Sequence, residues 1–193
     1  MLETYVKKIL SSKVYDLAKE TPLSPARLLT QRFGTQVYLK REDLQSIFSF
    51  KLRGAYNRMV HIDAKQLEKG VVTASAGNHA QGVAVAADKL NVKATVVMGF
   101  NTPAIKVESV KNFGAKVILH GDSYDEAAEF ANNLAESEGS TYIHPYDDPL
   151  VIAGQGTVGM EIANQHTGHI LSLIHISEPT RQEAISYAVF CLK

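Results

Sequence analysis

The sequence predicts an α/β fold built on an open parallel sheet of βα units. Short β-rich runs begin at Val71, Thr95, Val117 and Thr141, at intervals of 24, 22 and 24 residues. A helical pattern fills each interval, and strands that alternate with helices at this spacing form a parallel sheet.

The helices between these runs have recognisable ends. Thr102 and Pro103 predict an N-cap followed by the first helical residue, and Gly114 predicts the end of that helix. Ser123 and Glu126 have the spacing of a capping box. In the preceding interval, apolar residues at helical spacing form one face: Ala80, Val83, Ala84, Ala87 and Leu90.

The first 45 residues depart from the βα period. We expect a helix over residues 3–10, and the stretch TPLSPARL, with Pro22 and Pro25, predicts an extended entry into another short helix. The stretch QVYLKRED then predicts a strand that runs into charged residues. We therefore expect this segment to pack on a second body.

A further helix, with the sequence VIAGQGTVGMEIANQ, is predicted to start from Pro149. It contains Gly154, Gly156 and Gly159. A glycine inside a helix costs about 1 kcal/mol relative to alanine, so we expect these glycines to serve close packing or a ligand.

The C-terminal stretch LSLIHISEPTRQEAISYAVFCLK breaks the pattern, because it has no clean helical or strand periodicity and follows the last glycine, Gly168. It resembles the conceptual translation of sequencing-adaptor read-through, the alternative being a genuine divergent C-terminus. We expect residues 169–193 to be non-native and leave them out of the fold prediction.

Composition excludes several classes of protein. The 193 residues are 45% hydrophobic and 21% charged, and 20 basic residues balance 20 acidic ones, so nothing indicates a nucleic-acid or membrane partner. The single cysteine, Cys191, excludes an internal disulfide and a cysteine-rich metal site. The sequence contains no apolar run of about 18 residues and no secretory signal, which predicts a cytoplasmic protein.

The stretch SAGNHAQG, residues 75–82, follows the first predicted strand. A Gly–Asn pair where a strand meets a helix exposes backbone N–H groups that bind anions, at the strand ends where ligands bind in open sheets. An ordinary βα turn with Asn78 as the N-cap fits the same residues. No metal site is expected, because His79, His120 and His144 lack companion ligands and are interpreted as structural.

Lys51, in SFKLRGA, is a candidate Schiff-base lysine. Such an amine must be neutral, which requires burial or nearby cations. Arg53 and residues 40–41 are candidate cations, and Phe48 and Phe50 are candidate apolar walls. On these residues alone, a Lys–Arg pair on a solvated helix face is the simpler interpretation.

The order and spacing of KRED, SFKLRGAY, SAGNHAQG and VIAGQGT resemble the fold-type II pyridoxal-phosphate enzymes. The resemblance covers residues 5–168 and is closest to the threonine dehydratase branch, in its biosynthetic form. It implies a truncated fold like that of the tryptophan synthase β-subunit. The implied divisions are part of a large domain (1–48), a small α/β domain (49–148), the start of the return to the large domain (149–168) and the tail (169–193).

The resemblance also implies roles for individual residues. Lys51 would hold pyridoxal 5′-phosphate as a Schiff base, Asn78 would contact the 3′-oxygen of its ring, and Phe50 would lie against the ring. The residues matching the loop that receives the substrate carboxylate are Ser75, Ala76, Gly77 and His79.

The implied reaction is the dehydration and deamination of L-threonine, with L-serine as an alternative substrate. The cofactor is the electron sink, and Lys51, once displaced by the substrate amine, removes the α-proton. Loss of the β-hydroxyl and hydrolysis then give 2-oxobutanoate and ammonia, a step of isoleucine biosynthesis. The parent family is typically a homotetramer that isoleucine controls through C-terminal domains.

The sequence departs from the family where the tail begins, because the glycine loop for the cofactor phosphate and the group facing the pyridine nitrogen do not occur. We therefore expect weak cofactor binding and negligible activity. Serine racemase, serine dehydratase and the more distant cysteine synthase remain alternatives within the fold. A non-catalytic α/β binding module and an interaction protein that uses an apolar tail are alternatives outside it.

Overall fold

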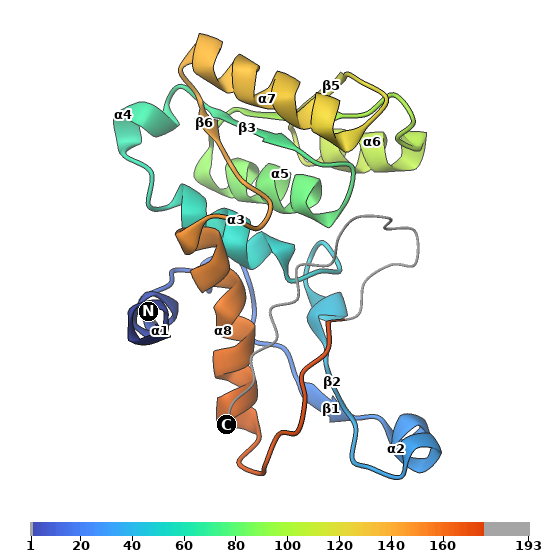
Figure 1. Cartoon of the computed structure of the whole chain (residues 1–193). Coiled ribbons are helices and arrows are strands. Elements are labelled where there is room, and N and C mark those ends of the chain that lie inside the picture. The colour runs from blue at the N-terminus through green and yellow to red at the C-terminus, as the bar shows by residue number, and fades with distance from the viewer. Residues whose placement is uncertain (1, 176–193) are drawn as a thin grey trace.

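The computed structural model describes residues 2–175, so most of the predicted non-native tail lies outside the described residues. Figure 1 shows an upper body, in which helices cover both faces of a sheet, and a lower body of helices and a small two-stranded sheet. Between the two bodies lies α3 (Lys51–Met59). The predicted division into domains has the same general outline but stays a prediction.

The upper sheet is parallel throughout, as predicted, and its strand order is β5-β4-β3-β6. The strands are β3 (Val71–Ala74), β4 (Ala94–Met98), β5 (Lys116–Leu119) and β6 (Thr141–Tyr142). Every residue of β3 is buried, because helices cover both faces of a central parallel strand.

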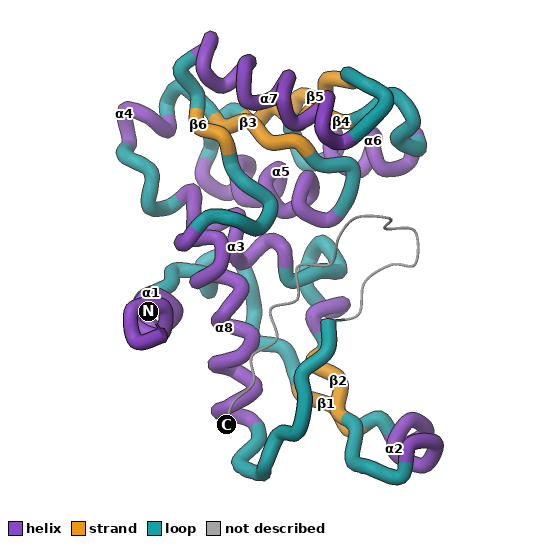
Figure 2. The backbone as a smooth tube through the Cα atoms, in the orientation of Figure 1, coloured by secondary structure: helices purple, strands orange, loops and turns teal. Residues whose placement is uncertain are grey.

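Helices lie on both faces of the sheet (Figure 2). Successive residues of a strand point to opposite faces, so they pack against different helices. Val71 and Val96 pack in a core that includes residues of α5 (Asn78–Leu90) and α6 (Ala104–Asn112). Val72 and Val97 pack against α7 (Tyr124–Glu138) on the other face. The apolar helix faces seen in the sequence therefore cover the sheet.

Two predicted helix ends are confirmed and one is wrong. Gly114, with φ of 80°, follows the last turn of α6 as predicted. The Ser123 hydroxyl accepts the N–H of Glu126 at 3.2 Å, which confirms the cap of α7. Pro103, not Thr102, is the N-cap of α6, because Pro103 has an extended ψ of 137° and its carbonyl accepts the first N–H bonds of the helix. The Thr102 hydroxyl is instead buried without a hydrogen-bond partner in the described part of the chain.

The lower body contains the N-terminal segment and the last helix. As predicted, this segment lies outside the main sheet, and its two strands form an antiparallel pair of their own. Its elements are α1 (Leu2–Leu10), β1 (Leu23–Pro25), α2 (Arg27–Phe33), β2 (Tyr38–Lys40) and the 3₁₀ helix η1 (Glu42–Leu44). A short helix that the sequence did not predict, α4 (Ala64–Leu67), belongs to the upper body, and α8 (Pro149–Gln165) is the predicted glycine-containing helix.

Glycines allow α3 and α8 to cross at close range. A Cβ atom on Gly154 would lie 2.6 Å from the carbonyl oxygen of Arg53, and one on Gly54 would lie 2.8 Å from that of Val151. A Cβ on Gly156 would lie 2.5 Å from Cδ1 of Ile9 in α1, whereas one on Gly159 would meet nothing within 4 Å. Packing thus accounts for Gly154 and Gly156.

Alanine substitutions at two glycines of α8 should have opposite effects. Gly154→Ala places a methyl group against the backbone of α3, and overpacking of this kind lowers the free energy of unfolding by about 1–3 kcal/mol. Gly159→Ala meets open space and should raise it by up to about 1 kcal/mol through helix propensity. Urea unfolding followed by circular dichroism measures both, and equal effects would contradict the close crossing.

Candidate functional site

The Lys51 amine lies at the edge of the sheet where the parallel strands end. Lys51 is the first, half-buried residue of α3, and its Nζ donates a hydrogen bond of 3.0 Å to the carbonyl oxygen of Pro145. Pro145 lies in the loop that leaves β6 and passes α3 in Figure 1. Ser75 directly follows β3 at the same edge, because the two strands are parallel neighbours.

A close helix contact places the loop over residues 75–79 beside the lysine. A Cβ atom on Gly82 would lie 3.0 Å from the carbonyl carbon and oxygen of Lys51. Helix α5 therefore approaches α3 at the level of Lys51, and the loop that opens α5 lies one turn away. The close approach at Gly82 thus brings the helices that carry SFKLRGA and SAGNHAQG into contact.

The loop itself is a turn stabilised from within. The N–H of Gly77 donates to the Ser75 hydroxyl at 3.2 Å, and Gly77 is the N-cap of α5. Asn78 is the first helical residue and therefore not the N-cap that the ordinary-turn interpretation assumed. Ser75 is buried, Ala76 is exposed, and Gly77 and Asn78 are half-buried. The first-turn N–H groups of such a helix form an anion-binding position.

The His79 side chain is fully buried, and its Nε2 lies 3.1 Å from the carbonyl oxygen of Ile143. The ring therefore links α5 to the end of β6 and does not reach the surface of the loop. His120 stacks on Phe130 at a centroid distance of 4.1 Å. In the described part of the chain, no cluster of three or more His, Cys, Asp or Glu side chains could hold a metal.

Of the two candidate aromatic residues, Phe50 is the one beside the lysine. Its ring centroid lies 5.7 Å from the Nζ of Lys51, and its other ring contact is with His175 at 4.8 Å. Phe48 has a left-handed backbone, with φ of 55°, and is 79% exposed. Phe50 thus provides an aromatic surface next to the amine.

Arg53 is fully buried, which makes the interpretation of a solvated Lys–Arg helix face wrong. Its Nε lies 2.8 Å from Glu42, and its Nη1 lies 2.6 Å from Glu161. Lys40 adds a contact of 2.6 Å to Glu161. The candidate cations at residues 40 and 53 are therefore engaged with carboxylates, and Arg41 pairs with Asp43 at the surface.

Arg53 and Glu161, which form the centre of this network, are both charged at neutral pH. Burial opposes the charge of Arg53, but hydrogen bonds to Glu42 and Glu161 outweigh it and raise the pKa of Arg53. Burial likewise opposes the charge of Glu161, yet hydrogen bonds from Arg53 and Lys40 keep its pKa below the ordinary 4.5. Burial, together with a hydrogen bond to Glu161, raises the pKa of Tyr15 to about 12.

Sequence reasoning missed Glu42 and Glu161 as partners. Glu42 stands in the quoted motif KRED, and Glu161 is one turn after Thr157, whose hydroxyl also contacts Arg53 at 3.1 Å. The available signal was therefore a polar stripe, at helical spacing, on an otherwise apolar helix.

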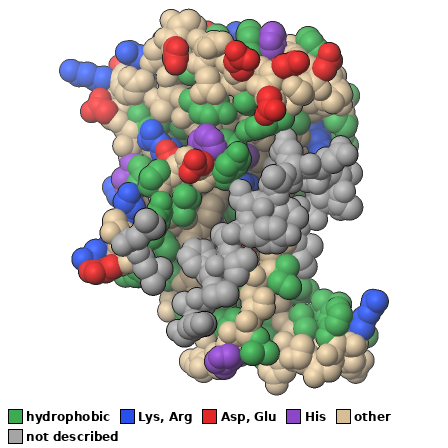
Figure 3. All heavy atoms as spheres, viewed as in Figure 1, with side chains coloured by type: hydrophobic (Ala, Val, Ile, Leu, Met, Phe, Trp, Pro, Cys, Tyr) green, Lys and Arg blue, Asp and Glu red, His purple; other side chains and the backbone are tan. Residues whose placement is uncertain are grey.

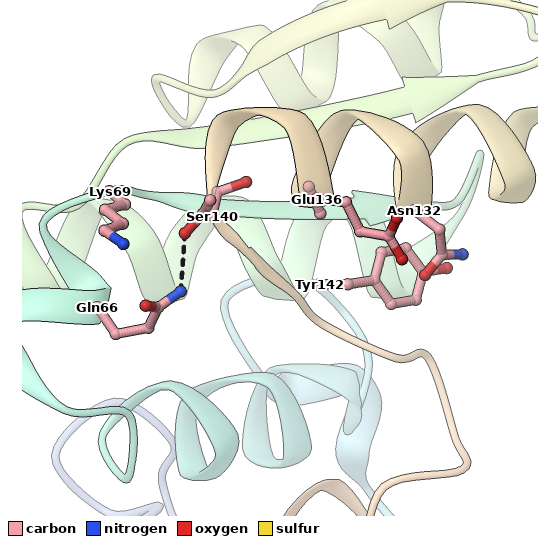
Figure 4. A pocket seen from close by; sticks show the side chains of 8 residues that line it. Gln66, Lys69, Asn132, Glu136, Ser140 and Tyr142 are labelled. Atoms are coloured by element: carbon pink, nitrogen blue, oxygen red, sulfur yellow. Dashed lines mark hydrogen bonds between the residues drawn. The ribbon is translucent and has the colours of Figure 1, made fainter.

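A hollow of about 460 Å³ lies at the opposite, amino-terminal edge of the sheet (Figure 4). In it, the Gln66 side chain donates to the carbonyl oxygen of Gly139 at 2.8 Å. Its lining residues are Gln66, Lys69, Asn132, Ala135, Glu136, Gly139, Ser140 and Tyr142.

On the face shown in Figure 3, acidic side chains gather over α7. A surface with this negative charge does not suit the binding of a polyanion.

The arrangement around Lys51 fits an aromatic aldehyde that bears anionic groups. It combines an amine for a Schiff base, the Phe50 ring for stacking and a helix start for an anion. The close approach at Gly82 keeps these groups on one edge of the sheet. The individual roles predicted for Lys51, Asn78 and Phe50 remain predictions.

Comparison with known proteins gives consistent matches. The family model of pyridoxal-phosphate dependent enzymes matches residues 14–175. The biosynthetic, chloroplastic threonine dehydratase of Arabidopsis thaliana is 60% identical over 164 residues, which cover 85% of this chain and 28% of that protein. The chain therefore spans less than a third of the length of this relative.

Solved structures agree. The processed form of threonine deaminase isoform 2 from Solanum lycopersicum has a TM-score of 0.82 and 53% identity, over 86% of this chain and 46% of that one. Maize serine racemase has a TM-score of 0.78 and 33% identity, over 84% of this chain and 49% of that one.

No helix in residues 2–175 is long and apolar enough to cross a membrane.

Substitution of Glu161 should reveal the buried network through the pH dependence of stability. Glu161→Gln leaves Arg53 and Lys40 with an uncompensated charge, so the free energy of unfolding at neutral pH should fall by about 3–5 kcal/mol. Because the folded pKa of Glu161 is lowered, its contribution is present above pH 4.5 and is lost as the pH falls through that folded pKa.

The difference in the free energy of unfolding between wild type and Glu161→Gln should therefore become smaller in acid. Urea unfolding over a pH series measures it. Glu129→Gln, at an exposed position of α7, is the control and should change little at any pH. A difference that stays constant into acid would contradict the charged network.

Proposed function

The chain belongs to the pyridoxal-phosphate-dependent enzymes, and on this premise we propose that it contributes the lysine-bearing part of the active site of a threonine dehydratase, which converts L-threonine to 2-oxobutanoate and ammonia. The observation that carries the proposal is the position of the Lys51 amine. It lies at the carboxyl edge of the sheet, beside Phe50 and next to the helix start at residues 75–79. The similarity to threonine dehydratases supports the choice of reaction.

Each residue has a physical role in this proposal. Lys51 would hold the cofactor through its Nζ and, as a neutral amine, would accept the α-proton of the substrate at that atom. Phe50 would lie against the cofactor ring, and the Asn78 amide would donate to the ring 3′-oxygen. When bound, pyridoxal 5′-phosphate supplies the electron sink for the negative charge that develops at Cα.

Backbone groups of the loop orient the substrate. The N–H groups around Ala76, Gly77 and His79 bind the substrate carboxylate, with the positive end of the α5 dipole behind them. The Ser75 hydroxyl shapes this turn by accepting the N–H of Gly77. A carboxylate held in this way fixes which bond at Cα is aligned for cleavage.

The finer statements about the whole protein belong to the same proposal. We propose a role in isoleucine biosynthesis, which the biosynthetic name of the Arabidopsis relative supports. The homotetramer is proposed on the family resemblance alone. The expected cytoplasmic location stays a prediction, because the Arabidopsis relative is named chloroplastic. The division at residues 48, 148 and 168 is part of the proposal, and the place of α3 between the two bodies supports the boundary at residue 48.

Serine racemization is the second candidate, favoured by the structural similarity to maize serine racemase. Both reactions begin at the same lysine, so cofactor binding does not separate them. The full-length protein would form a 2-oxo acid from L-threonine in the first case and D-serine from L-serine in the second.

Borohydride reduction after addition of pyridoxal phosphate should attach the cofactor to one peptide, that of Lys51, identified by mass spectrometry. Lys51→Met should abolish the label because the reacting amine is lost. Lys69→Met, an exposed lysine at the opposite edge of the sheet, is the matched control and should keep the label.

Labelling at another lysine would overturn the assignment of Lys51, and no label would favour a non-catalytic module. Turnover of L-threonine is measured in the same preparation as 2-oxo acid. We expect it to be negligible beside that of an intact lyase.

A further inference from the structure

The turn that leaves β6 contains a histidine with an unusual local role. His144 is half-buried, and its Nδ1 accepts two backbone N–H groups, from Tyr146 at 3.2 Å and from Asp147 at 2.7 Å. Its ring also contacts the rings of Tyr142 and Tyr146, at centroid distances of 6.1 and 4.6 Å. The imidazole therefore closes the turn around Pro145.

The two bonds define the protonation state of the ring. An Nδ1 that accepts two N–H groups carries no proton, so the neutral ring holds its proton on Nε2. Burial lowers the pKa of His144, Lys51 lowers it further, and Asp147 and Asp148 oppose this shift. If Nδ1 carried a proton, it could not accept the N–H groups of Tyr146 and Asp147, and the turn would open.

The turn is anchored at both ends on the elements that carry the site. At its start, the Ile143 carbonyl accepts the Thr73 hydroxyl at 2.8 Å. At its end, the Asp148 carboxylate pairs at 2.8 Å with Arg58 of α3 and also caps α8. The middle of the turn holds the Pro145 carbonyl that accepts the Lys51 amine.

We propose that His144 is a positioning residue, whose Nδ1 holds the turn so that the Pro145 carbonyl receives the Nζ of Lys51. This inference rests on the proposed function of Lys51 and extends it to a side chain that acts through the turn after β6. Its action passes through two backbone N–H groups and one carbonyl oxygen. The geometry requires an acceptor at the δ position and not an imidazole as such.

Two substitutions separate the acceptor from the ring. His144→Asn keeps an acceptor at the δ position, which closes turns of this kind, and His144→Phe keeps a ring without the acceptor. In the cofactor-free chain, the Nζ signal of Lys51 in a nitrogen NMR spectrum should stay near its wild-type position in His144→Asn and shift in His144→Phe. The wild-type imidazole should show the Nε2-protonated tautomer and titrate below pH 6.5.

Cofactor trapping gives the second readout. The rate at which borohydride-reducible pyridoxal phosphate forms on Lys51 should be similar in wild type and His144→Asn, and about tenfold lower in His144→Phe, because a displaced reacting group costs rate. The trapping rate of wild type, divided by that of His144→Asn, should fall once His144 is protonated, below pH 6.5. Circular dichroism checks that both variants are folded.

An Nδ1-protonated tautomer, or trapping by His144→Phe at the wild-type rate, would overturn the role of His144. If wild type is not labelled at Lys51, the proposed function fails instead. The NMR comparison of the cofactor-free variants still decides whether His144 positions the lysine.

Discussion

The ion-pair network of Arg53 is the interaction on which the rest of this structure depends. One fully buried guanidinium joins Glu42 in η1 to Glu161 in α8, from its own place in α3. A buried charge of this kind tolerates only arrangements in which its partners are present, so it selects one packing of the three elements. Lys51 stands two residues earlier on the same helix, and the rotation that buries Arg53 therefore sets the direction of the lysine side chain.

Around this network, glycines allow α3 to pack closely between two helices. Gly82 lets α5 approach the backbone of Lys51, and Gly54 with Gly154 lets α8 approach from the lower body. The loop of residues 75–79 and the turn after β6 are consequently brought to the same lysine by backbone packing. The site is thus built from close backbone approaches.

Local patterns in the sequence were sufficient to predict much of the fold. The βα spacing predicted the parallel sheet, and Ser123 predicted the start of α7, because both depend on neighbours along the chain. The family resemblance implied that Lys51 and the loop at residues 75–79 serve one cofactor. Arg53 was misread because its partners lie 11 and 108 residues away, and the acceptor role of His144 depends on a turn geometry that residue identity alone does not reveal.

The hydrogen bond between Lys51 and Pro145 spans 94 residues of chain, which bears on how the site is made during translation. At a synthesis rate of about 5–20 residues per second, the lysine precedes its acceptor by roughly 5–20 s. During that interval β6 and the turn after it do not yet exist, and Lys51 is an ordinary lysine of a nascent chain. The lysine that would bind the cofactor is thus among the earlier parts of the site to be synthesised, and it acquires its surroundings last.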